Sequence, residues 1–220
     1  YASGILRHTV ISNLACNCDC LYCFENKNNQ FMTMETAKAY LEWLEPQTRD
    51  IKYFYMSWFG GEPLLSKKII EFITDGILKL ADKYHFEYSA CVVTNGVLAD
   101  DAFVSSCERL HIMNLQVTID GERNIHNRYR FLKIDHGETF DTILANLNDF
   151  CSRVHSDTAT ILRINLTDEN YQTVPQLFDE IPKDVRDNSV LLFRWVYSHV
   201  EGRSPGIEFS AKKKGSRPYE

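Results

Sequence analysis

Six β-prone runs alternate with helical patterns along this chain, and that alternation limits the fold more than any other feature. The runs cover residues 9–14, 51–59, 86–93, 112–119, 158–166 and 189–196. Apolar residues at helical spacing lie between them, within residues 33–46, 66–80, 102–110, 140–150 and 170–181. Such alternation favours a parallel sheet with helical crossovers. The sequence therefore predicts an α/β fold, either an open doubly wound sheet or an incomplete barrel, with an irregular stretch at residues 122–137.

Unusual residues follow four of the six predicted strands. A cysteine-rich segment follows the first, Gly-Gly-Glu-Pro the second, Thr-Asn-Gly the third and Asp-Gly the fourth, at residues 16–23, 60–63, 94–96 and 120–121. In both candidate architectures the C-terminal ends of parallel strands meet at one edge, where ligands bind. We therefore expect one site to be assembled from these four segments.

The cysteine-rich segment contains Cys16, Cys20 and Cys23 at Cys-x3-Cys-x2-Cys spacing. Three thiolates on one loop can hold three irons of a cubane [4Fe–4S] cluster. Ligation by four thiolates gives a closed electron carrier, whereas an open corner can bind a substrate, as the open position of a catalytic zinc site does. The spacing predicts an open cluster, with Cys18 as a bystander; a site that uses all four thiols is the alternative.

Other interpretations of this loop compete with the cluster. A disulfide is disfavoured because nothing in the sequence is typical of a secreted protein. A thioredoxin-like pair of Cys20 and Cys23 leaves Cys16 without a role. Zinc accepts three or four thiolates and is the main rival, although zinc ribbons supply a second cysteine pair and the remaining cysteines are isolated. A zinc site or a closed cluster without catalysis therefore stays open.

The other strand-end segments also have two readings each. All are common turn signals. In the functional reading, Gly60 and Gly61 let a ligand approach the backbone, with Glu62 as a nearby carboxylate or as a residue that only fixes the loop. Thr94 and Asn95 would offer a hydroxyl and an amide to a polar ligand.

Three side chains beyond these turns are candidates for a ligand site or for its support. Arg130 is either a surface charge or a clamp for a carboxylate. His126 is predicted to be structural, hydrogen-bonded near the loop after the fourth strand. Asn165 alternates with apolar neighbours on the fifth strand together with Arg163. If the apolar residues face the helices, this polar pair faces the interior of the sheet.

Composition limits the partners. The chain has 220 residues, 44% of them hydrophobic, and a formal net charge of −6. A negative net charge argues against a nucleic-acid partner, and no apolar run approaches the roughly 20 residues of a membrane span. Seven cysteines, an odd number, fit a reducing cytoplasm better than a disulfide framework. We expect a single domain over residues 1–200 and a linker or mobile tail over 201–220 that leads to a further C-terminal region.

With these segments in order, the chain resembles the radical S-adenosylmethionine (SAM) superfamily. The cysteine loop, with Tyr22 at its aromatic position, matches the superfamily signature; residues 60–63 and 94–96 match its GGEP and TNG motifs. Residues 118–121, with Ile125, His126 and Arg130, are similar to a pattern of peptide-modifying maturases with a C-terminal SPASM domain, such as anaerobic sulfatase-maturating enzymes. The resemblance covers residues 10–196 and implies a partial (β/α)6 barrel.

The resemblance also implies the cofactors and their sites. Cys16, Cys20 and Cys23 would ligate a [4Fe–4S] cluster whose open iron chelates SAM. Residues on the loops and strand ends would contact SAM: Tyr22, Gly60, Gly61, Glu62, Thr94, Asn95, Thr118, Asp120, Arg130, Asn165 and the backbone near Leu191. The catalytic acid or base is not predicted. The reduced cluster would cleave SAM, and the 5′-deoxyadenosyl radical would take a hydrogen from the substrate.

The resemblance favours a peptide or protein side chain as the substrate, with flavodoxin or ferredoxin as electron donor; a small metabolite is the alternative. The chain departs from the maturase pattern at Thr118, where Ser is usual, and at Asn127, where Asp is usual. It also has no cysteine after Cys151, whereas SPASM maturases carry more for auxiliary clusters.

Overall fold

Six parallel strands form one sheet in this computed structural model, which describes residues 4–154 and 160–196. Each strand pairs in parallel with the next along the chain. An open doubly wound sheet would reverse its strand order at a switch point, and here the order simply follows the chain. The fold is therefore the partial barrel, with strands β1 (Ile5–Asn13), β2 (Tyr53–Gly60), β3 (Glu87–Thr94), β4 (Ile112–Thr118), β5 (Thr160–Leu166) and β6 (Ser189–Trp195).

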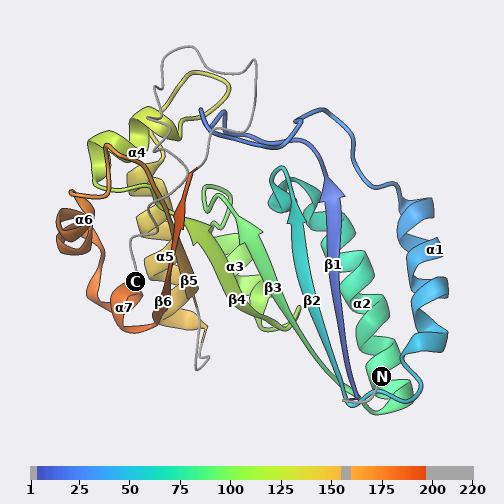
Figure 1. Ribbon diagram of the computed structural model, residues 1–220. Coiled ribbons are helices and arrows are strands. Elements are labelled where there is room, and N and C mark those ends of the chain that lie inside the picture. Colours follow the sequence, from blue (N-terminus) through green and yellow to red (C-terminus); the bar gives the residue numbers. More distant parts are fainter. Residues whose placement is uncertain (1–3, 155–159, 197–220) are drawn as a thin grey trace, which may run out of the picture.

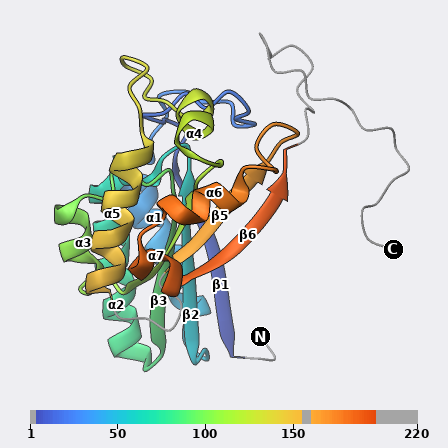
Figure 2. The ribbon, with the colours of Figure 1, turned by 90° about the vertical axis from the view of Figure 1, so that its left-hand side faces the viewer.

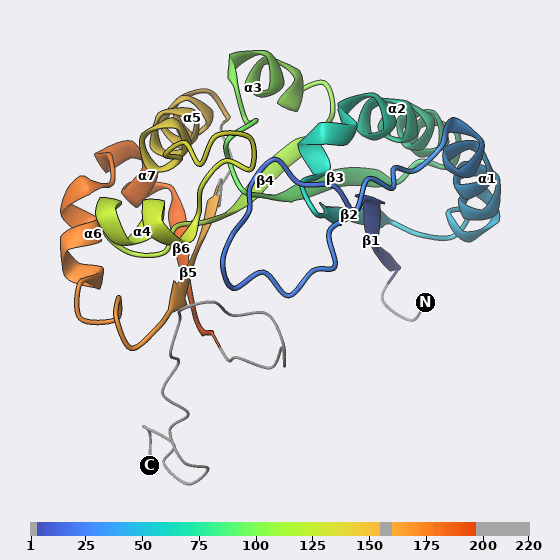
Figure 3. The ribbon, with the colours of Figure 1, turned by 90° about the horizontal axis from the view of Figure 1, so that it is seen from above.

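Helices line the outer side of the curved sheet, and all strands point toward the same edge (Figures 1 and 3). Figure 2 shows the helices of the C-terminal half and β6 from the side. The helices are α1 (Met34–Leu44), α2 (Lys67–Tyr84), α3 (Asp101–Cys107), α4 (Arg123–Tyr129), α5 (Phe140–Arg153), α6 (Val174–Glu180) and α7 (Lys183–Asp187), with 3-10 turns η1 (Glu45–Gln47) and η2 (Pro63–Ser66).

Two of these helices lie where the sequence predicted none. The stretch 122–137 was expected to be irregular, yet it contains α4. This helix has only seven residues and is capped by Glu122, whose side chain accepts the N–H of Asn124; a segment so short shows too little apolar periodicity to be recognised. The expected helix at 170–181 is shorter, because residues 170–173 form turns and α6 begins next to a proline. Helix α7 was not predicted.

Side-chain alternation along the strands separates a core face from a cavity face. Phe54, Met56 and Trp58 alternate on β2 and are fully buried. On β5, Leu162 and Ile164 are buried in the same core. Arg163 and Asn165, which alternate with them, line a cavity on the other face. This confirms the alternation read from the sequence of that strand.

The sheet ends at β6, an edge strand with large apolar side chains in contact with solvent: Val190, Leu191, Phe193 and Trp195 are all exposed. The expected domain boundary near residue 200 and the tail 201–220 lie outside the described residues. Within the described part, none of the helices combines the length and the apolar character that crossing a membrane requires.

Candidate active site

A cavity of about 260 Å³ opens at the C-terminal ends of the strands. Its wall draws on the cysteine loop, the two glycines after β2, and the ends of β3 to β6. The lining residues are Cys16, Cys20, Tyr22, Cys23, Phe24, Glu25, Lys27, Phe59, Gly60, Gly61, Val93, Thr94, Asn95, Gln116, Thr118, Arg130, Arg163, Asn165, Trp195 and Val196. The segments after the first three predicted strands thus meet in one place, as the sequence predicted, and Thr118 at the end of β4 joins them.

The cysteine loop is anchored at its base and in its middle. Near β1, the N–H of Leu14 donates to the carbonyl of Gln30 at 2.9 Å, and that of Met32 to Ser12 at 2.9 Å. Farther along, the N–H of Asp19 donates to the carbonyl of Phe131 at 3.0 Å. A loop tied to β1 and to the segment after α4 presents its cysteines in a fixed orientation toward the cavity.

The thiols of Cys16, Cys20 and Cys23 all line this cavity and are free of disulfides. Cys18 is buried and is absent from the cavity wall. Its thiol hydrogen-bonds Cys16, which lowers the pKa of Cys16 and raises that of Cys18. Within residues 4–154 and 160–196, no three His, Cys, Asp or Glu side chains converge on a position for one metal ion.

Two glycines bring the loop after β2 against the segment that carries Cys16. A Cβ at Gly60 would lie 2.3 Å from the backbone oxygen of Asn13, and one at Gly61 would lie 2.2 Å from that of Ala15. Gly60 also has a φ of +144°, which L side chains rarely adopt. Here the glycines are required by contact between two backbones, in addition to any contact with a ligand.

Glu62 is fully buried beneath the cavity and is not part of its wall. Its Oε1 accepts the N–H of Leu64 at 2.9 Å and the hydroxyl of Thr94 at 2.8 Å, and its Oε2 accepts the N–H of Asn95 at 2.7 Å. Burial raises the pKa of Glu62 to about 7, although these three hydrogen bonds lower it. The carboxylate therefore joins the loops after β2 and β3, the loop-fixing role that the sequence left open.

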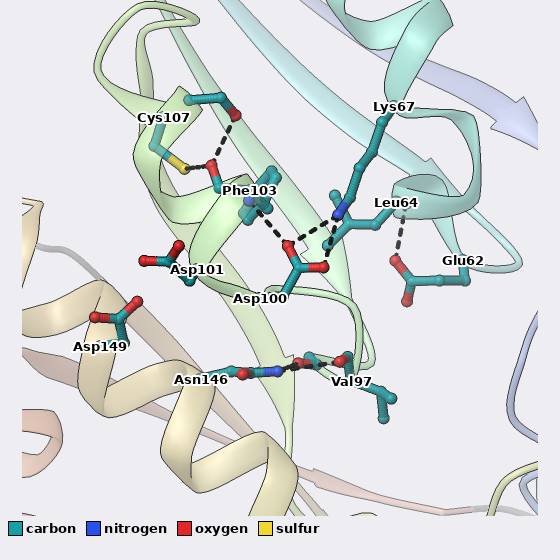
Figure 4. A network of polar contacts seen from close by, with 12 residues as sticks. Glu62, Leu64, Lys67, Val97, Asp100, Asp101, Phe103, Cys107, Asn146 and Asp149 are labelled. Carbon is teal, nitrogen blue, oxygen red and sulfur yellow. Dashed lines mark hydrogen bonds and ion pairs between the residues drawn. The ribbon is translucent and has the colours of Figure 1, made fainter.

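The loop after β3 is held from its other side by α5. Figure 4 shows Asn146 reaching toward Val97, and its Nδ2 donates to the carbonyls of Gly96 at 2.9 Å and Val97 at 3.0 Å. The same view shows Glu62 capping the turn at Leu64. Asn95, between these supports, points its Nδ2 at Asn17 at 2.7 Å and at Cys16 Sγ at 3.7 Å. A polar chain thus connects Glu62 to the cysteine loop.

Arg130 approaches the cavity from the opposite side. It is 7% exposed, its Nη1 donates to the Tyr22 hydroxyl at 2.7 Å, and the same nitrogen lies 3.8 Å from Asp120. The Tyr22 hydroxyl in turn donates to Asp120. The Nε of Arg130 has no protein partner within the described residues. A buried guanidinium with an unused donor at the cavity wall suits an anionic ligand group.

His126 lies behind this group and contacts only protein. Its Nδ1 accepts the N–H of Asp120 at 3.2 Å, and its Nε2 lies 3.1 Å from the Thr139 hydroxyl. That hydroxyl donates to the carbonyl of Arg130 at 2.8 Å, so Nε2–H is the donor to Thr139. The structural role predicted for His126 is confirmed. Burial, and then the charge of Arg130, hold its pKa well below 6.5.

Not every predicted site residue reaches the cavity wall. Asp120 and Glu62 act through other residues, as described above. Leu191 is paired with Leu162 in the middle of β6 and does not line the cavity; the part of β6 that does is Trp195, followed by Val196. Sequence reasoning missed Trp195 because its pattern resembles that of any apolar strand. It also missed Lys27 and Gln116, whose positions depend on how the loop and sheet fold.

The Radical SAM superfamily model matches residues 10–181. This chain belongs to the radical SAM superfamily. Radical SAM enzymes use a [4Fe–4S] cluster and SAM, so membership of the superfamily confirms both cofactors predicted from the sequence. The free thiols on the cavity wall and the unused donor of Arg130 fit these two groups.

Relatives of this radical SAM enzyme have diverse names. An uncharacterized protein of Methanocaldococcus jannaschii is 32% identical over 145 residues, which is 63% of this chain and 46% of that protein. The radical SAM cyclopropyl synthase TigE of Paramaledivibacter caminithermalis is 29% identical over 57% of this chain and 31% of its own length. The Fe-coproporphyrin III synthase of Methanosarcina barkeri is 24% identical over 77% of this chain and 39% of its own length.

Solved structures share the fold of this radical SAM enzyme. The structure of anSMEcpe with bound S-adenosylmethionine superposes with a TM-score of 0.75 at 18% identity, covering 93% of this chain and 55% of that one. Streptococcus suis SuiB bound to its precursor peptide SuiA gives 0.64 at 13% identity, covering 89% and 40%. The chain thus spans less than half the length of its curated relatives.

Proposed function

We propose that this chain binds a [4Fe–4S] cluster through Cys16, Cys20 and Cys23, binds SAM beside it, and abstracts hydrogen from a peptide or protein side chain. The observation that carries the proposal is the convergence of these three thiols, the Gly60–Gly61 backbone and the Arg130 guanidinium on one cavity. Cys18, buried and off the wall, leaves the fourth corner of the cluster without a protein ligand.

The wall residues divide into groups suited to the parts of SAM. Backbone carbonyls of Gly60 and Gly61 suit the methionine ammonium, because no Cβ stands between backbone and ligand. Thr118 and Asn165 offer polar groups at the ends of β4 and β5. Arg130 suits the carboxylate or the ribose, since its Nε is unused. Thr94, Asn95, Glu62 and Asp120 complete the proposed set, the last two by fixing the wall.

When bound, the cluster would supply the electron for cleavage of SAM, and SAM would supply the group that abstracts hydrogen from the substrate. The protein's own contribution is orientation and the exclusion of water. On one side of the cavity, the Tyr22 hydroxyl hydrogen-bonds both Arg130 and Asp120 and so fixes their relative positions. On the other side, Asn95 fixes the loop that carries Cys16. We also propose a low-potential protein such as flavodoxin or ferredoxin as the electron donor.

Two similar structures support a peptide substrate. One is anSMEcpe with bound AdoMet and the Cp18Cys peptide, and the other is Streptococcus suis SuiB bound to its precursor peptide SuiA. In this chain Phe24 is 74% exposed on the cavity wall, and Trp195, also exposed, lies on the wall at the end of β6. An aromatic rim of this kind suits an extended chain that crosses the mouth. We further propose that the complete protein acts in the cytoplasm, in keeping with its free thiols.

A small metabolite is the second candidate. It is favoured by one comparison, the likeness to an Fe-coproporphyrin III synthase over 77% of this chain. Arg163, on the cavity wall with Arg130, would then be available for a carboxylate of the substrate.

The test is anaerobic incubation of the reconstituted protein with SAM and dithionite. We expect 5′-deoxyadenosine by chromatography, and at most traces from Cys16→Ala. A matched control is Cys107→Ala, a buried cysteine at the end of α3, which should keep the activity. Equal product from wild type and Cys16→Ala would overturn the proposed chemistry. Deuterium transfer from labelled peptides, compared with labelled iron tetrapyrroles, separates the two substrate classes.

A further inference from the structure

Lys27 lies four residues beyond the last cysteine of the loop and turns back onto it. Its Nζ donates to the backbone carbonyl of Cys18 at 2.8 Å, and its side chain lines the cavity with Cys16, Cys20 and Cys23. The side chain is only 13% exposed. A largely buried lysine side chain at this place is unusual, because lysines are mostly exposed to solvent.

The charge of Lys27 is only weakly compensated by protein carboxylates. Its ion-pair partner, Asp19, lies 3.6 Å away with a side chain that is 61% exposed, and exposed pairs of this kind are screened by water. Arg130, the other buried cation near the cysteines, lies 3.8 Å from the buried Asp120. Its positive charge therefore acts mainly on the cysteine loop.

A fixed positive charge beside a cluster favours the form that carries one more negative charge. With three thiolates, an oxidised [4Fe–4S]2+ core has a net charge of −1 and the reduced [4Fe–4S]1+ core a net charge of −2. Reduction adds one electron from a low-potential donor and moves no proton. Net charge, hydrogen bonds to sulfur and solvent exposure set the potentials of such clusters. An ammonium on the wall of the same cavity, shielded from solvent, acts through the first of these.

We propose that Lys27 is a positioning residue that closes the cysteine loop through the Cys18 carbonyl and raises the reduction potential of the cluster. The inference rests on the proposed function, since it requires the cluster to bind at the three cysteines. It adds a determinant of how readily the bound cluster accepts its electron, beyond the ligands themselves. Asp19 opposes Lys27, because its negative charge lies on the same loop.

The test is a redox titration of the holoenzyme without SAM. The reduced cluster is monitored by its electron paramagnetic resonance signal. Lys27→Gln removes the charge and should disfavour reduction about tenfold, a 59 mV fall in midpoint potential for a one-electron couple. Lys27→Arg should keep the potential close to that of wild type. The matched control is Lys38→Gln, an exposed lysine on α1, which should change nothing.

Asp19→Asn provides an opposite and independent measurement. It should raise the potential, and by less than Lys27→Gln lowers it, because the side chain of Asp19 is 61% exposed and its charge is screened by water. If Lys27→Gln does not retain a cluster, Asp19→Asn alone decides, and an unchanged potential in that variant would overturn the proposal. A Lys27→Gln variant whose cluster keeps the wild-type potential would also overturn the proposal. A wild-type protein that binds no cluster contradicts the proposed function instead, which keeps the two failures distinct.

Discussion

The backbone N–H of Asn95 lies 2.7 Å from Oε2 of Glu62, so a buried carboxylate joins the ends of β2 and β3. Oε1 of the same group accepts from Thr94 and Leu64. Asn95 then reaches Cys16 and Asn17 through its side chain. Two motifs that are separate in sequence are thus one support for the cysteine loop.

Replacing Glu62 tests this support and its protonation. The pKa of Glu62 is raised from 4.5 to about 7 in the folded chain, so the folded state binds more protons than the unfolded state between these pH values, and stability falls as pH rises through them. At about 1.4 kcal/mol per pH unit, the penalty approaches about 3.5 kcal/mol above pH 7. We expect the stability advantage of wild type over Glu62→Gln, from urea unfolding of the cluster-free protein, to shrink between pH 5 and pH 8. A constant difference would contradict the raised pKa.

His126 should produce a pH dependence of the opposite sign. Its pKa is held well below 6.5 when folded, so the unfolded state binds the extra proton and stability is lost as pH falls below about 6.5. We expect wild type to lose up to about 2 kcal/mol relative to His126→Asn between pH 7 and pH 5. The measurement is again urea unfolding. Parallel pH profiles for the two proteins would show that His126 is not buried in its neutral form.

Gly61→Ala should disturb the cysteine loop without touching it chemically. The new Cβ would lie 2.2 Å from the backbone oxygen of Ala15, next to Cys16, so backbone must move. We expect a loss of about 2 kcal/mol or more in the free energy of unfolding, and less iron bound after reconstitution. Gly137→Ala is the control, because its Cβ would meet side chains and no backbone atom: Asp135 Oδ1 at 2.9 Å and Leu132 Cδ1 at 3.3 Å. Equal iron contents in the two variants would contradict this role of Gly61.

Arg130→Lys should weaken SAM binding while leaving the cluster in place. A lysine cannot reproduce the planar donors that contact Tyr22 and leave Nε for a ligand. We expect roughly tenfold weaker binding by calorimetry, with iron content unchanged. Arg128→Lys, an exposed arginine whose side chain is 56% accessible, is the control. An unaltered affinity for SAM in Arg130→Lys would remove Arg130 from the proposed site.

Local patterns were sufficient to predict the parts of the fold and site that depend on neighbouring residues. The strand and helix alternation predicted six parallel strands, which the structure shows in chain order, and the alternation around Arg163 predicted the polar face of β5. The spacing of Cys16, Cys20 and Cys23 identified the loop whose cysteines line the cavity.

What the sequence missed depends on contacts between distant segments. Helix α4 is short and rests on the Glu122 cap. Lys27 joins the site only because the loop folds back onto Cys18. The sequence named the backbone near Leu191 on β6, whereas the residue of that strand that lines the cavity is Trp195; register at a strand end is set by the pairing with β5, which composition does not show.

In the proposed cluster, one iron has no protein ligand and is open to SAM. The most direct measurement is electron–nuclear double resonance of the reduced, reconstituted protein with SAM labelled with 15N at its amino group. We predict a hyperfine coupling from the labelled nitrogen to the cluster, present in Cys18→Ala as in wild type. A reduced cluster whose spectrum shows no coupling to the label and does not change with SAM would contradict the account.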